Sequence, residues 1–395
     1  MTAREHHERR GPEAREHRER RGPEAPSGLE DVVAADSGIC TVDGENGVLS
    51  YRGFDIHVLA ERSSFEEVCF LLWDGRLPRA DELAALTAEI GRGRVLPAKA
   101  LEWIERAARA LSPMDALRTI VSALPETDPD AESMEPAANR HKAVRLTGQL
   151  ASIVAGLHRV REGKPFVPAD PGRTHADDFL RMLGGETARS AAVRAFDVAL
   201  ILHADHELNA STFAARVTAA TLANIHAAMT SAIGTLGGPL HGGANERVME
   251  MLLAIGSLDR VDDDLRARLA RKERIMGFGH RVYRTEDPRA THLRAMSREV
   301  AESFGETRWY DMSRRIERIV NAEKRLNANV DFYSASLYHL LGIPRQLFTP
   351  IFAVSRVAGW TAHVLEQYAH NRLIRPRAEY TGPKYPQTYV EIGKR

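Results

Sequence analysis

Two histidine-containing stretches supply the first residues that could do chemistry, because histidine changes charge near neutral pH more readily than other side chains. LGGPLHGGANERVMEML (236–252) places His241 between glycine-rich turns, just ahead of an amphipathic helix. LILHADHELNASTF places His203 and His206 at the end of an apolar helix. His203 alone is typical of a hydrogen-bonded core residue, whereas His241 fits a turn residue and a catalytic group about equally.

The third histidine stretch, KERIMGFGHRVYRTEDPRA, surrounds His280 with positive charge from Arg281, Arg284 and Arg289. Arginines that crowd one short glycine-containing loop repel each other unless an anion joins them, so this loop predicts an anionic ligand. NANVDFYSAS places Asp331 among apolar and aromatic residues. On its own, this aspartate is best read as a helix N-cap.

The composition excludes several classes of protein. The chain has 395 residues, with 54 lysines and arginines against 54 aspartates and glutamates, and this balance gives no support to binding of nucleic acid or a membrane surface. Cys40 and Cys69 lie in apolar runs without the spacing of a metal or redox pair, which is typical of reduced core residues in the cytoplasm. The uncharged stretch 217–245 is rich in small and polar residues, which argues against a membrane span.

The elements that must position these residues are mostly helices. An imperfect duplication, AREHHERRGPE and AREHRERRGPE, makes residues 1–27 a charged tail that we expect to be disordered. GICTVDGENGVLSYRG predicts a small hairpin around its GENG turn. Ser64 with Glu67 predicts a capping box, and Ser112-Pro113 a helix start.

Helical periodicity recurs in many segments after the hairpin, so the predicted fold class is mainly α. The segments are 142–163, 188–202, 212–234, 245–256, 262–272, 290–304, 312–325 and 348–370. The segment 212–234 has no polar face, and its small side chains favour close packing at a homodimer interface.

Four stretches together resemble the signature of the citrate synthase family. They are GFGHRVYRTEDPR (277–289), GPLHGGAN around His241, NVDFYS around Asp331 and FAVSRVAGW around Arg356. Their order and spacing match, and the resemblance extends from Gly28 to the C-terminus. It implies an acyltransferase that joins the methyl carbon of acetyl-CoA to the ketone of oxaloacetate and then hydrolyses the citryl thioester, without a metal or any other cofactor.

The resemblance also implies roles for the residues that carry it. Asp331 would be the base that takes a methyl proton, and partial desolvation would raise its basicity. His241 would donate a hydrogen bond to the enol oxygen, kept neutral by the positive end of the following helix, with the glycines leaving space for the thioester. The neutral histidine of triosephosphate isomerase acts as a donor in the same way. His280 would polarise the ketone of oxaloacetate.

Further cations are assigned to the substrates on the same basis. Arg289 and Arg356 would bind the oxaloacetate carboxylates beside His206, while Arg375 would come from the neighbouring subunit of a homodimer. Arg284 is the main candidate for the CoA phosphates. The weaker candidates, which are more typical of a solvated helix end, are Arg271, Lys272 and Arg274. The expected adenine pocket is the backbone of Met276, Gly277, Phe278 and Gly279.

The family's architecture implies a large and a small helical domain with a small N-terminal β-hairpin. The large domain would comprise 28–241 and 342–395, the second part carrying a C-terminal segment that embraces the partner, and the small domain 242–341. Closure of the domains would exclude water from the site. The tail does not resemble the N-terminal β-rich region of NADH-regulated members, so a simple cytoplasmic dimer is expected.

Three other functions remain open. The residues equally suit 2-methylcitrate synthase, because propionyl-CoA differs by one methylene and such a difference is worth only about 1–3 kcal/mol. A sensor that binds CoA or a dicarboxylate without catalysis is disfavoured by the presence of all three catalytic candidates. A metal hydrolase using His203, Asp205, His206 and His241 lacks the i, i+4 zinc spacing and leaves the arginines unexplained.

Overall fold

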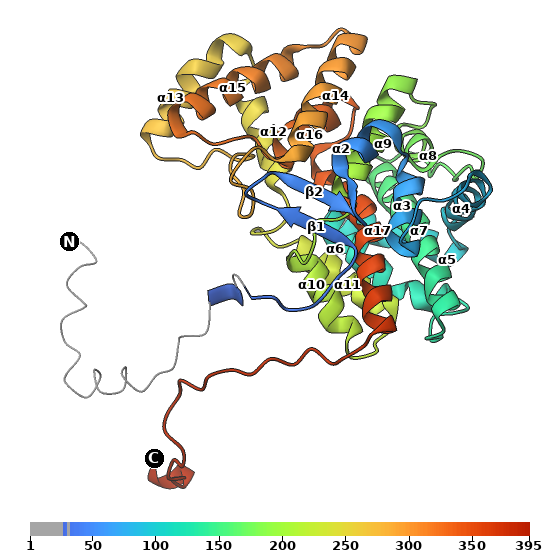
Figure 1. Ribbon diagram of the computed structural model, residues 1–395, viewed down its shortest axis with the longest axis vertical. Helices are drawn as coiled ribbons and strands as arrows, with labels where there is room; N and C mark the ends of the chain where they lie inside the picture. Colours follow the sequence, from blue (N-terminus) through green and yellow to red (C-terminus); the bar gives the residue numbers. More distant parts are fainter. Residues whose placement is uncertain (1–26, 30–31) are drawn as a thin grey trace, which may run out of the picture. The chain divides into compact units, whose positions relative to one another are not determined.

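A computed structural model describes residues 27–29 and 32–395 of the chain (Figure 1). The predicted disordered tail therefore lies outside the described residues, except for its last residue. Ser37–Ile374 forms one compact unit, and the chain termini form a second, which includes Arg375–Arg395. Within the second unit, the exposed segment Arg375–Arg395 has one short 3-10 helix, Ile392–Lys394, while another short 3-10 helix spans Ser27–Leu29.

Helices dominate the Ser37–Ile374 unit, as the periodicity predicts. The α-helices of the described chain are α2 (Ile56–Arg62), α3 (Phe65–Asp74), α4 (Ala80–Gly93), α5 (Ala98–Ala110), α6 (Pro113–Ala123), α7 (Pro136–Arg161), α8 (His175–Gly184), α9 (Ser190–His203), α10 (Ala210–Ala219), α11 (Ile225–Leu236), α12 (Ala244–Ile255), α13 (Val261–Ala270), α14 (Pro288–Phe304), α15 (Arg308–Lys324), α16 (Val330–Leu340) and α17 (Phe348–Ala369). Short 3-10 helices in this unit span Leu124–Thr127, Leu258–Arg260 and Arg345–Leu347. No helix of the described residues is long and apolar enough to cross a membrane.

The predicted hairpin is present as part of a three-stranded antiparallel sheet. β1 (Cys40–Asp43) pairs with β2 (Val48–Tyr51), which pairs with β3 (Phe54–Asp55). Cys40 lies opposite Tyr51, and Asp43 lies opposite Val48, so the GENG sequence forms the turn. The confirmed hairpin follows from local chemistry, because glycine at a positive φ of 66° closes the turn at Gly47.

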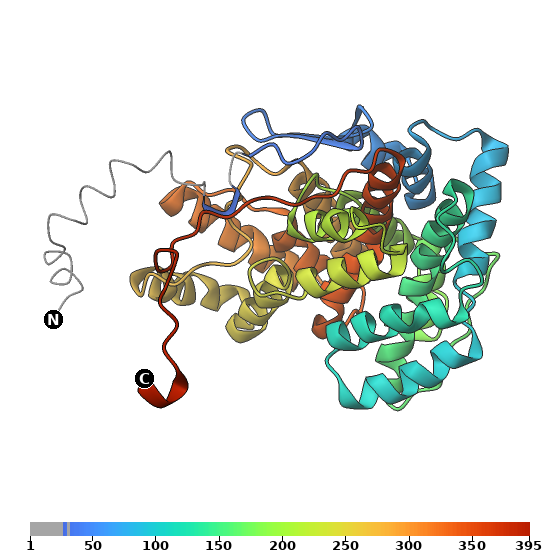
Figure 2. The same cartoon turned by 90° about the horizontal axis from the view of Figure 1, so that it is seen from below.

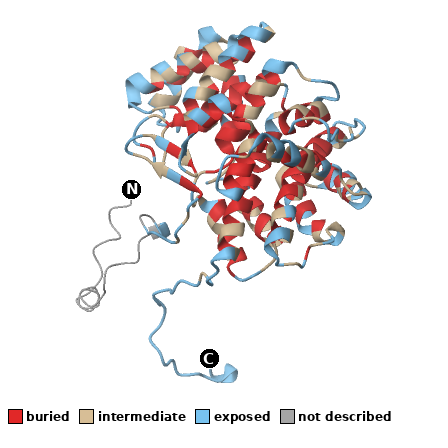
Figure 3. Cartoon of the chain, turned by 45° about the vertical axis from the view of Figure 1, so that its right-hand side comes forward, coloured by how far each residue is buried: buried red, intermediate tan, exposed pale blue. Residues whose placement is uncertain are grey.

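The longest helices form the core of this unit. α7 and α17 pack against each other, and α17 also contacts α3, α9, α10 and α11. Nearly every turn of α17 is buried, as the red ribbon in Figure 3 shows. Helices α12, α14 and α15 gather around α16 at one end of the unit (Figure 1), but the predicted boundaries of a small domain at 242 and 341 stay predictions.

One prediction of a single unbroken helix is wrong. The segment 212–234 is two helices, α10 and α11, which pack against each other. The break occurs where Leu222 adopts a positive φ of 63° and Asn224 caps α11 by accepting a hydrogen bond from the Ala227 N–H. Apolar periodicity continues through the break because both helices bury their small residues in the same core.

Local capping signals are confirmed in part. Ser112 accepts a hydrogen bond from the Asp115 N–H, with Pro113 at the first helical position of α6. Ser64 likewise caps α3 through the Glu67 N–H, but the predicted box is incomplete. The Glu67 carboxylate accepts instead from the hydroxyl of Ser63, the residue before the N-cap.

Candidate active site

His206 and His280 lie together although 73 residues separate them. Their ring centroids are 5.3 Å apart, and the Tyr283 hydroxyl lies 3.2 Å from His206 Nε2. His206 belongs to the connection between α9 and α10, and His280 to the loop between α13 and α14. Burial, followed by the charge of Arg289, lowers the pKa of His206 well below its usual value, so its imidazole is neutral at pH 7.

Two backbone N–H groups determine which ring nitrogen of His280 carries the hydrogen. The N–H groups of Val282 and Tyr283 donate to His280 Nδ1 at 3.0 and 3.1 Å. Because a backbone N–H only donates, Nδ1 is an acceptor and the ring hydrogen must be on Nε2. Burial and then Arg289 lower the pKa of His280 to about 4, so the ring is a neutral donor through Nε2.

His241 has the opposite tautomer. The Ser211 N–H donates to His241 Nε2 at 3.3 Å, and the Ser211 hydroxyl lies 2.8 Å from the same nitrogen. The hydrogen is therefore on Nδ1. Burial and then the charge of Arg356 lower the pKa of His241 to about 4, which gives a neutral donor as the sequence predicts. The causes are burial and Arg356, whereas the sequence argument relied on the helix terminus.

The glycines after His241 serve the backbone. A Cβ at Gly242 would lie 2.3 Å from the Leu236 carbonyl oxygen, and Gly243 has a positive φ of 78° where it caps α12. Both positions therefore need glycine for the chain's own packing. The predicted space for a thioester beside them stays a prediction.

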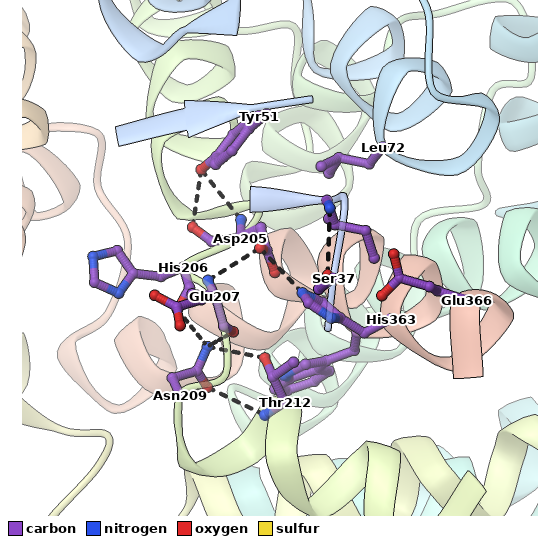
Figure 4. A network of polar contacts seen from close by, with 12 residues as sticks. Ser37, Tyr51, Leu72, Asp205, His206, Glu207, Asn209, Thr212, His363 and Glu366 are labelled. Atoms are coloured by element: carbon purple, nitrogen blue, oxygen red, sulfur yellow. Dashed lines mark hydrogen bonds and ion pairs between the residues drawn. The ribbon is translucent and has the colours of Figure 1, made fainter. Parts of the chain in front are cut away.

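Ser211 is itself held by groups that the sequence reasoning missed. Its hydroxyl lies 2.8 Å from Asn209 Oδ1 and accepts from the Trp360 indole N–H at 3.1 Å. The Asn209 side chain also caps α10, because it accepts a hydrogen bond from the Thr212 N–H at 3.2 Å. Figure 4 shows Asn209 and Thr212 in the segment that follows His206. The signal was available in the sequence, because asparagine is a preferred N-cap residue and Asn209 stands directly before a helical segment.

Two buried arginines lie among these groups. Arg289 makes a two-pronged ion pair with Asp287, with nitrogen–oxygen distances of 2.9 and 2.8 Å. Asp287 also accepts from the N–H groups of Arg289 and Val330, so it fixes the start of α14 against the start of α16. Arg356 donates through Nε to the His203 carbonyl at 2.7 Å. The sequence reasoning quoted Asp287 only within the motif and gave it no role.

Asp331 is a carboxylate without a hydrogen-bond donor among the described residues. The N-cap of α16 is Asn329, whose side chain accepts from the Asp331 N–H at 3.0 Å, so the alternative N-cap role of Asp331 is excluded. Burial raises the pKa of Asp331 to about 6, against the opposing charge of Arg289. The group is ionised at pH 7 and is a stronger base than an exposed aspartate.

The charges of the two arginines connect all of these groups. Arg289 is close enough to shift the pKa values of His206, His280 and Asp331, and Arg356 shifts those of His206, His241 and Asp331. The structure thus brings together all three catalytic candidates and three of the four candidates for oxaloacetate binding. The fourth, Arg375, begins the exposed terminal segment and its predicted role stays a prediction.

His203 is a core residue, as expected from its apolar helix. Its Nδ1 lies 2.7 Å from the Ala199 carbonyl in the preceding turn, and burial lowers its pKa to about 3. Among the described residues no three His, Cys, Asp or Glu side chains lie close enough to hold a metal ion.

A cavity of about 200 Å³ opens beside His280. Its other lining residues include Gly279, Arg284, Arg325, Asn327 and Asn329. The loop 277–279 is tied to this wall because the Gly279 N–H donates to the Asn327 carbonyl and the Asn329 N–H donates to the Gly277 carbonyl. Phe278 and Ala328 form the bridge between the two segments.

The basic side chains that the sequence predicts to bind the CoA phosphates divide into two groups. Arg284 lines the cavity and lies 3.9 Å from Glu45, with an exposed side chain. The weaker candidates lie outside the cavity lining, where Arg271 pairs with Glu273 at 2.7 Å while Lys272 and Arg274 are exposed. Arg325, which the sequence reasoning missed, lines the cavity, and its proximity to the NANVDF stretch was the available signal.

Comparisons with known proteins agree with this geometry. A family model described as citrate synthase, C-terminal domain, matches residues 28–377. "Citrate synthase 2" of Bacillus subtilis (strain 168) is 51% identical over 371 residues, which cover 93% of this chain and 98% of that protein. A protein of Shewanella oneidensis named 2-methylcitrate synthase is 40% identical over 375 residues, with coverage of 93% and 98%.

The fold is similar to that of solved structures. The crystal structure of citrate synthase from Pyrobaculum aerophilum superposes with a TM-score of 0.87 at 38% identity, and the match covers 93% of this chain and 95% of the other.

Proposed function

The chain belongs to the citrate synthase family, and from this premise we propose that it condenses acetyl-CoA with oxaloacetate and water to give citrate and CoA. The observation that carries the proposal is the opposed protonation of two neutral histidines. His241 offers its hydrogen through Nδ1 and His280 through Nε2, and each is fixed by backbone N–H groups. A reaction that develops negative charge on two oxygens, one on each substrate, needs such a pair of donors.

The first step forms the nucleophile. The Asp331 carboxylate accepts a proton from the methyl carbon of acetyl-CoA, and the released electron pair forms the carbon–carbon double bond of the enol. His241 Nδ1–H donates to the thioester oxygen as charge develops there. A pKa of about 6 makes Asp331 a better base than an ordinary aspartate while leaving it ionised at pH 7.

The second step forms the carbon–carbon bond. The enol carbon attacks the ketone carbon of oxaloacetate while the thioester carbonyl re-forms. His280 Nε2–H polarises the ketone oxygen, which takes the Nε2 proton to become the hydroxyl of citryl-CoA. The ring regains its proton from solvent. Arg289, Arg356 and His206 would bind the carboxylates, and the pairing of Arg289 with Asp287 leaves its remaining N–H groups in a fixed orientation. Water then hydrolyses the thioester and releases the CoA thiol.

The CoA moiety would lie along the cavity beside His280. Arg284 and Arg325 supply positive charge there. Of the predicted adenine pocket, Met276 to Gly279, Gly279 lines the cavity, and the adenine would lie against this segment. The exposed cations Arg271, Lys272 and Arg274 remain secondary candidates for the phosphates. No step needs a metal ion, redox group or other cofactor, because each bond is made and broken by proton transfer and addition.

We further propose a cytoplasmic homodimer with a large domain (28–241 and 342–395) and a small domain (242–341). Arg375 would enter the neighbouring active site of that dimer. The exposure of Arg375 and of the segment that follows it supports a role outside its own subunit.

Release of the CoA thiol from purified protein tests the proposal. Oxaloacetate is supplied with acetyl-CoA or with propionyl-CoA in parallel, and kcat/KM is compared. We expect acetyl-CoA to be the better substrate, since the relative named citrate synthase is 51% identical and the one named 2-methylcitrate synthase is 40% identical. Equal or better turnover of propionyl-CoA would identify a 2-methylcitrate synthase. A folded protein that binds the substrates but releases no thiol would be a sensor instead.

A further inference from the structure

The β1–β2 hairpin contacts both loops that carry the oxaloacetate-side histidines. We infer that this hairpin is a positioning element for His280 and His206, acting on His280 through the backbone amides of residues 282–284. The inference rests on the proposed function, because it assigns the hairpin to the oxaloacetate half of that site. Figures 1 and 2 show the hairpin beside the loop that precedes α14.

The tip of the hairpin is in direct contact with the His280 loop. The Arg284 N–H donates to the Gly44 carbonyl at 2.9 Å. A Cβ added at Gly44 would lie 2.2 Å from the Val282 carbonyl oxygen, and one at Gly47 would lie 2.5 Å from the Thr285 hydroxyl. At Gly44 the two backbones therefore pack as closely as glycine allows, while Gly47 packs against the side chain of Thr285.

Three consecutive amides connect this contact to the chemistry. The N–H groups of Val282 and Tyr283 donate to His280 Nδ1, and the next one, from Arg284, donates to the hairpin. The hairpin therefore fixes the orientation of the peptide segment that assigns the His280 tautomer. A shifted segment would withdraw the two donors from Nδ1, and the ring hydrogen would then distribute between both nitrogens.

The turn is stiff enough to impose this orientation. The Asp43 carboxylate accepts from the Glu45 N–H at 3.1 Å, from the Asn46 N–H at 3.0 Å and from the Asn46 side-chain amide at 2.6 Å. These bonds, led by that of the Asn46 side chain, lower the pKa of Asp43. The turn is thus held by its own side chains rather than by the loop that it contacts.

The base of the hairpin holds the second loop. The buried Tyr51 hydroxyl lies 3.2 Å from the Ile201 carbonyl and 3.0 Å from the Asp205 carbonyl, and it accepts from the Asp205 N–H at 3.2 Å. Figure 4 shows Tyr51 above Asp205 and the adjoining His206. Glu207, directly after His206, has a positive φ of 53°, a backbone conformation that needs such external support. One rigid hairpin thus sets the relative position of two rings 5.3 Å apart.

Gly44→Ala tests the inference, with Gly184→Ala as its matched control. A Cβ at Gly184 meets no heavy atom within 4 Å and this residue lies at the end of α8, away from the site. We expect Gly44→Ala to lower kcat on the order of tenfold or more, because displacement of a catalytic group by about 1 Å is costly. The Kd of oxaloacetate, measured by calorimetry, should rise by a smaller factor than kcat falls, because Arg289 and Arg356 lie on α14 and α17 and keep their positions. The control should keep both values.

A spectroscopic measurement separates positioning from a general loss of structure. In ¹⁵N-histidine-labelled protein, the ring nitrogen shifts report the tautomer, and His280→Gln assigns the relevant signals. We expect the Nε2–H signature of His280 in the wild type and the control, a mixture of tautomers in Gly44→Ala, and an unchanged Nδ1–H signature for His241. Wild-type kcat in Gly44→Ala, or a fall in kcat with an unchanged His280 signature, would overturn the inference.

Asp43→Ala provides a second route if Gly44→Ala does not fold. This variant loosens the turn without inserting atoms between the hairpin and the loop, so a smaller change in kcat and tautomer is expected in the same direction. An Asp43→Ala protein with wild-type kcat and tautomer would contradict the positioning role. The tautomer is measured without turnover. A wild type that releases no thiol would therefore overturn the proposed function, while the spectra would still decide whether the hairpin positions His280.

Discussion

His241 and His280 present opposite ring nitrogens to the site, and the difference originates in which nitrogen meets backbone N–H donors. Ser211 faces Nε2 of His241, whereas Val282 and Tyr283 face Nδ1 of His280. Burial lowers both pKa values to about 4, so neither ring carries a charge at pH 7. Neutral donors in fixed orientations stabilise developing negative charge without first forming ion pairs with the substrates.

Asp331→Asn should nearly abolish turnover and raise stability at the same time. Loss of the base should lower kcat by about 10²- to 10⁴-fold. The pKa of Asp331 is raised to about 6 in the folded protein, so its stabilising contribution is full below about pH 4 and is lost as pH rises through 6. The Tm of the variant should therefore exceed that of the wild type at pH 8, with a difference that shrinks towards pH 4. Asp263→Asn, at a side chain that is 91% exposed, is the control.

The pH dependence of catalysis should follow the same carboxylate. We expect kcat/KM for acetyl-CoA to fall as pH decreases through about 6, where Asp331 becomes protonated. The pKa values of His241 and His280 are about 4, so these two groups titrate below the pH range in which kcat/KM falls. Loss of thioester absorbance is the suitable measurement, since thiol reagents react slowly in acid. A rate that stays constant down to pH 5 would exclude Asp331 as the base.

The pH dependence of the free energy of unfolding that comes from His241 and His280 should have the opposite sign to that from Asp331. Their folded pKa values of about 4 lie below the unfolded value of about 6.5. Their contribution to folding is therefore full above about pH 6.5 and is lost as pH falls through 4.

At the scale of elements, three helix N-termini meet at the site, and each has a cap that also orders a functional group. Asn209 caps α10 beside Ser211, Asp287 caps α14 and pairs with Arg289, and Asn329 caps α16 beside Asp331. Helix starts combine a fixed backbone with free N–H donors, which makes them suitable supports for catalytic side chains.

Asn209→Ala and Asn224→Ala should separate the two roles of a cap. Each removes an N-cap, from α10 and α11 respectively, and should destabilise the protein by about 1 kcal/mol. Only Asn209 also contacts the Ser211 hydroxyl, so only Asn209→Ala should lower kcat as well as Tm. Equal kcat values in the two variants would show that Asn209 acts on stability alone.

At the scale of the whole molecule, the proposed dimer makes a test by complementation possible. Arg375→Ala and Asp331→Asn should each inactivate a homodimer. If Arg375 completes the partner's site, a mixed dimer of the two variants has one intact site, so random reassociation should restore about a quarter of wild-type activity. Activity should be measured after refolding the mixture, with each variant refolded alone as a control. An Arg375→Ala protein with full activity, or a mixture without recovery, would contradict the shared site.

The sequence by itself determined the features that depend on few neighbouring residues. The GENG turn, the serine cap before Pro113 and the helical periodicity are all confirmed, because their energetics are local. The four family stretches also singled out the residues around His241, His280, Asp331 and Arg356, while His206 lies in a separate histidine stretch. Reactive side chains are limited to a few types, so an unusual local setting is visible in the sequence.

Tertiary structure alone decided how those groups are protonated, paired and supported. The Ser211 donor lies 30 residues from His241, and the Gly44 acceptor lies 240 residues from Arg284. The break near Leu222 and the cavity position of Arg325 likewise follow from packing between distant segments. A hydrogen bond fixes a tautomer only when both partners are held in place, and long-range packing provides that constraint.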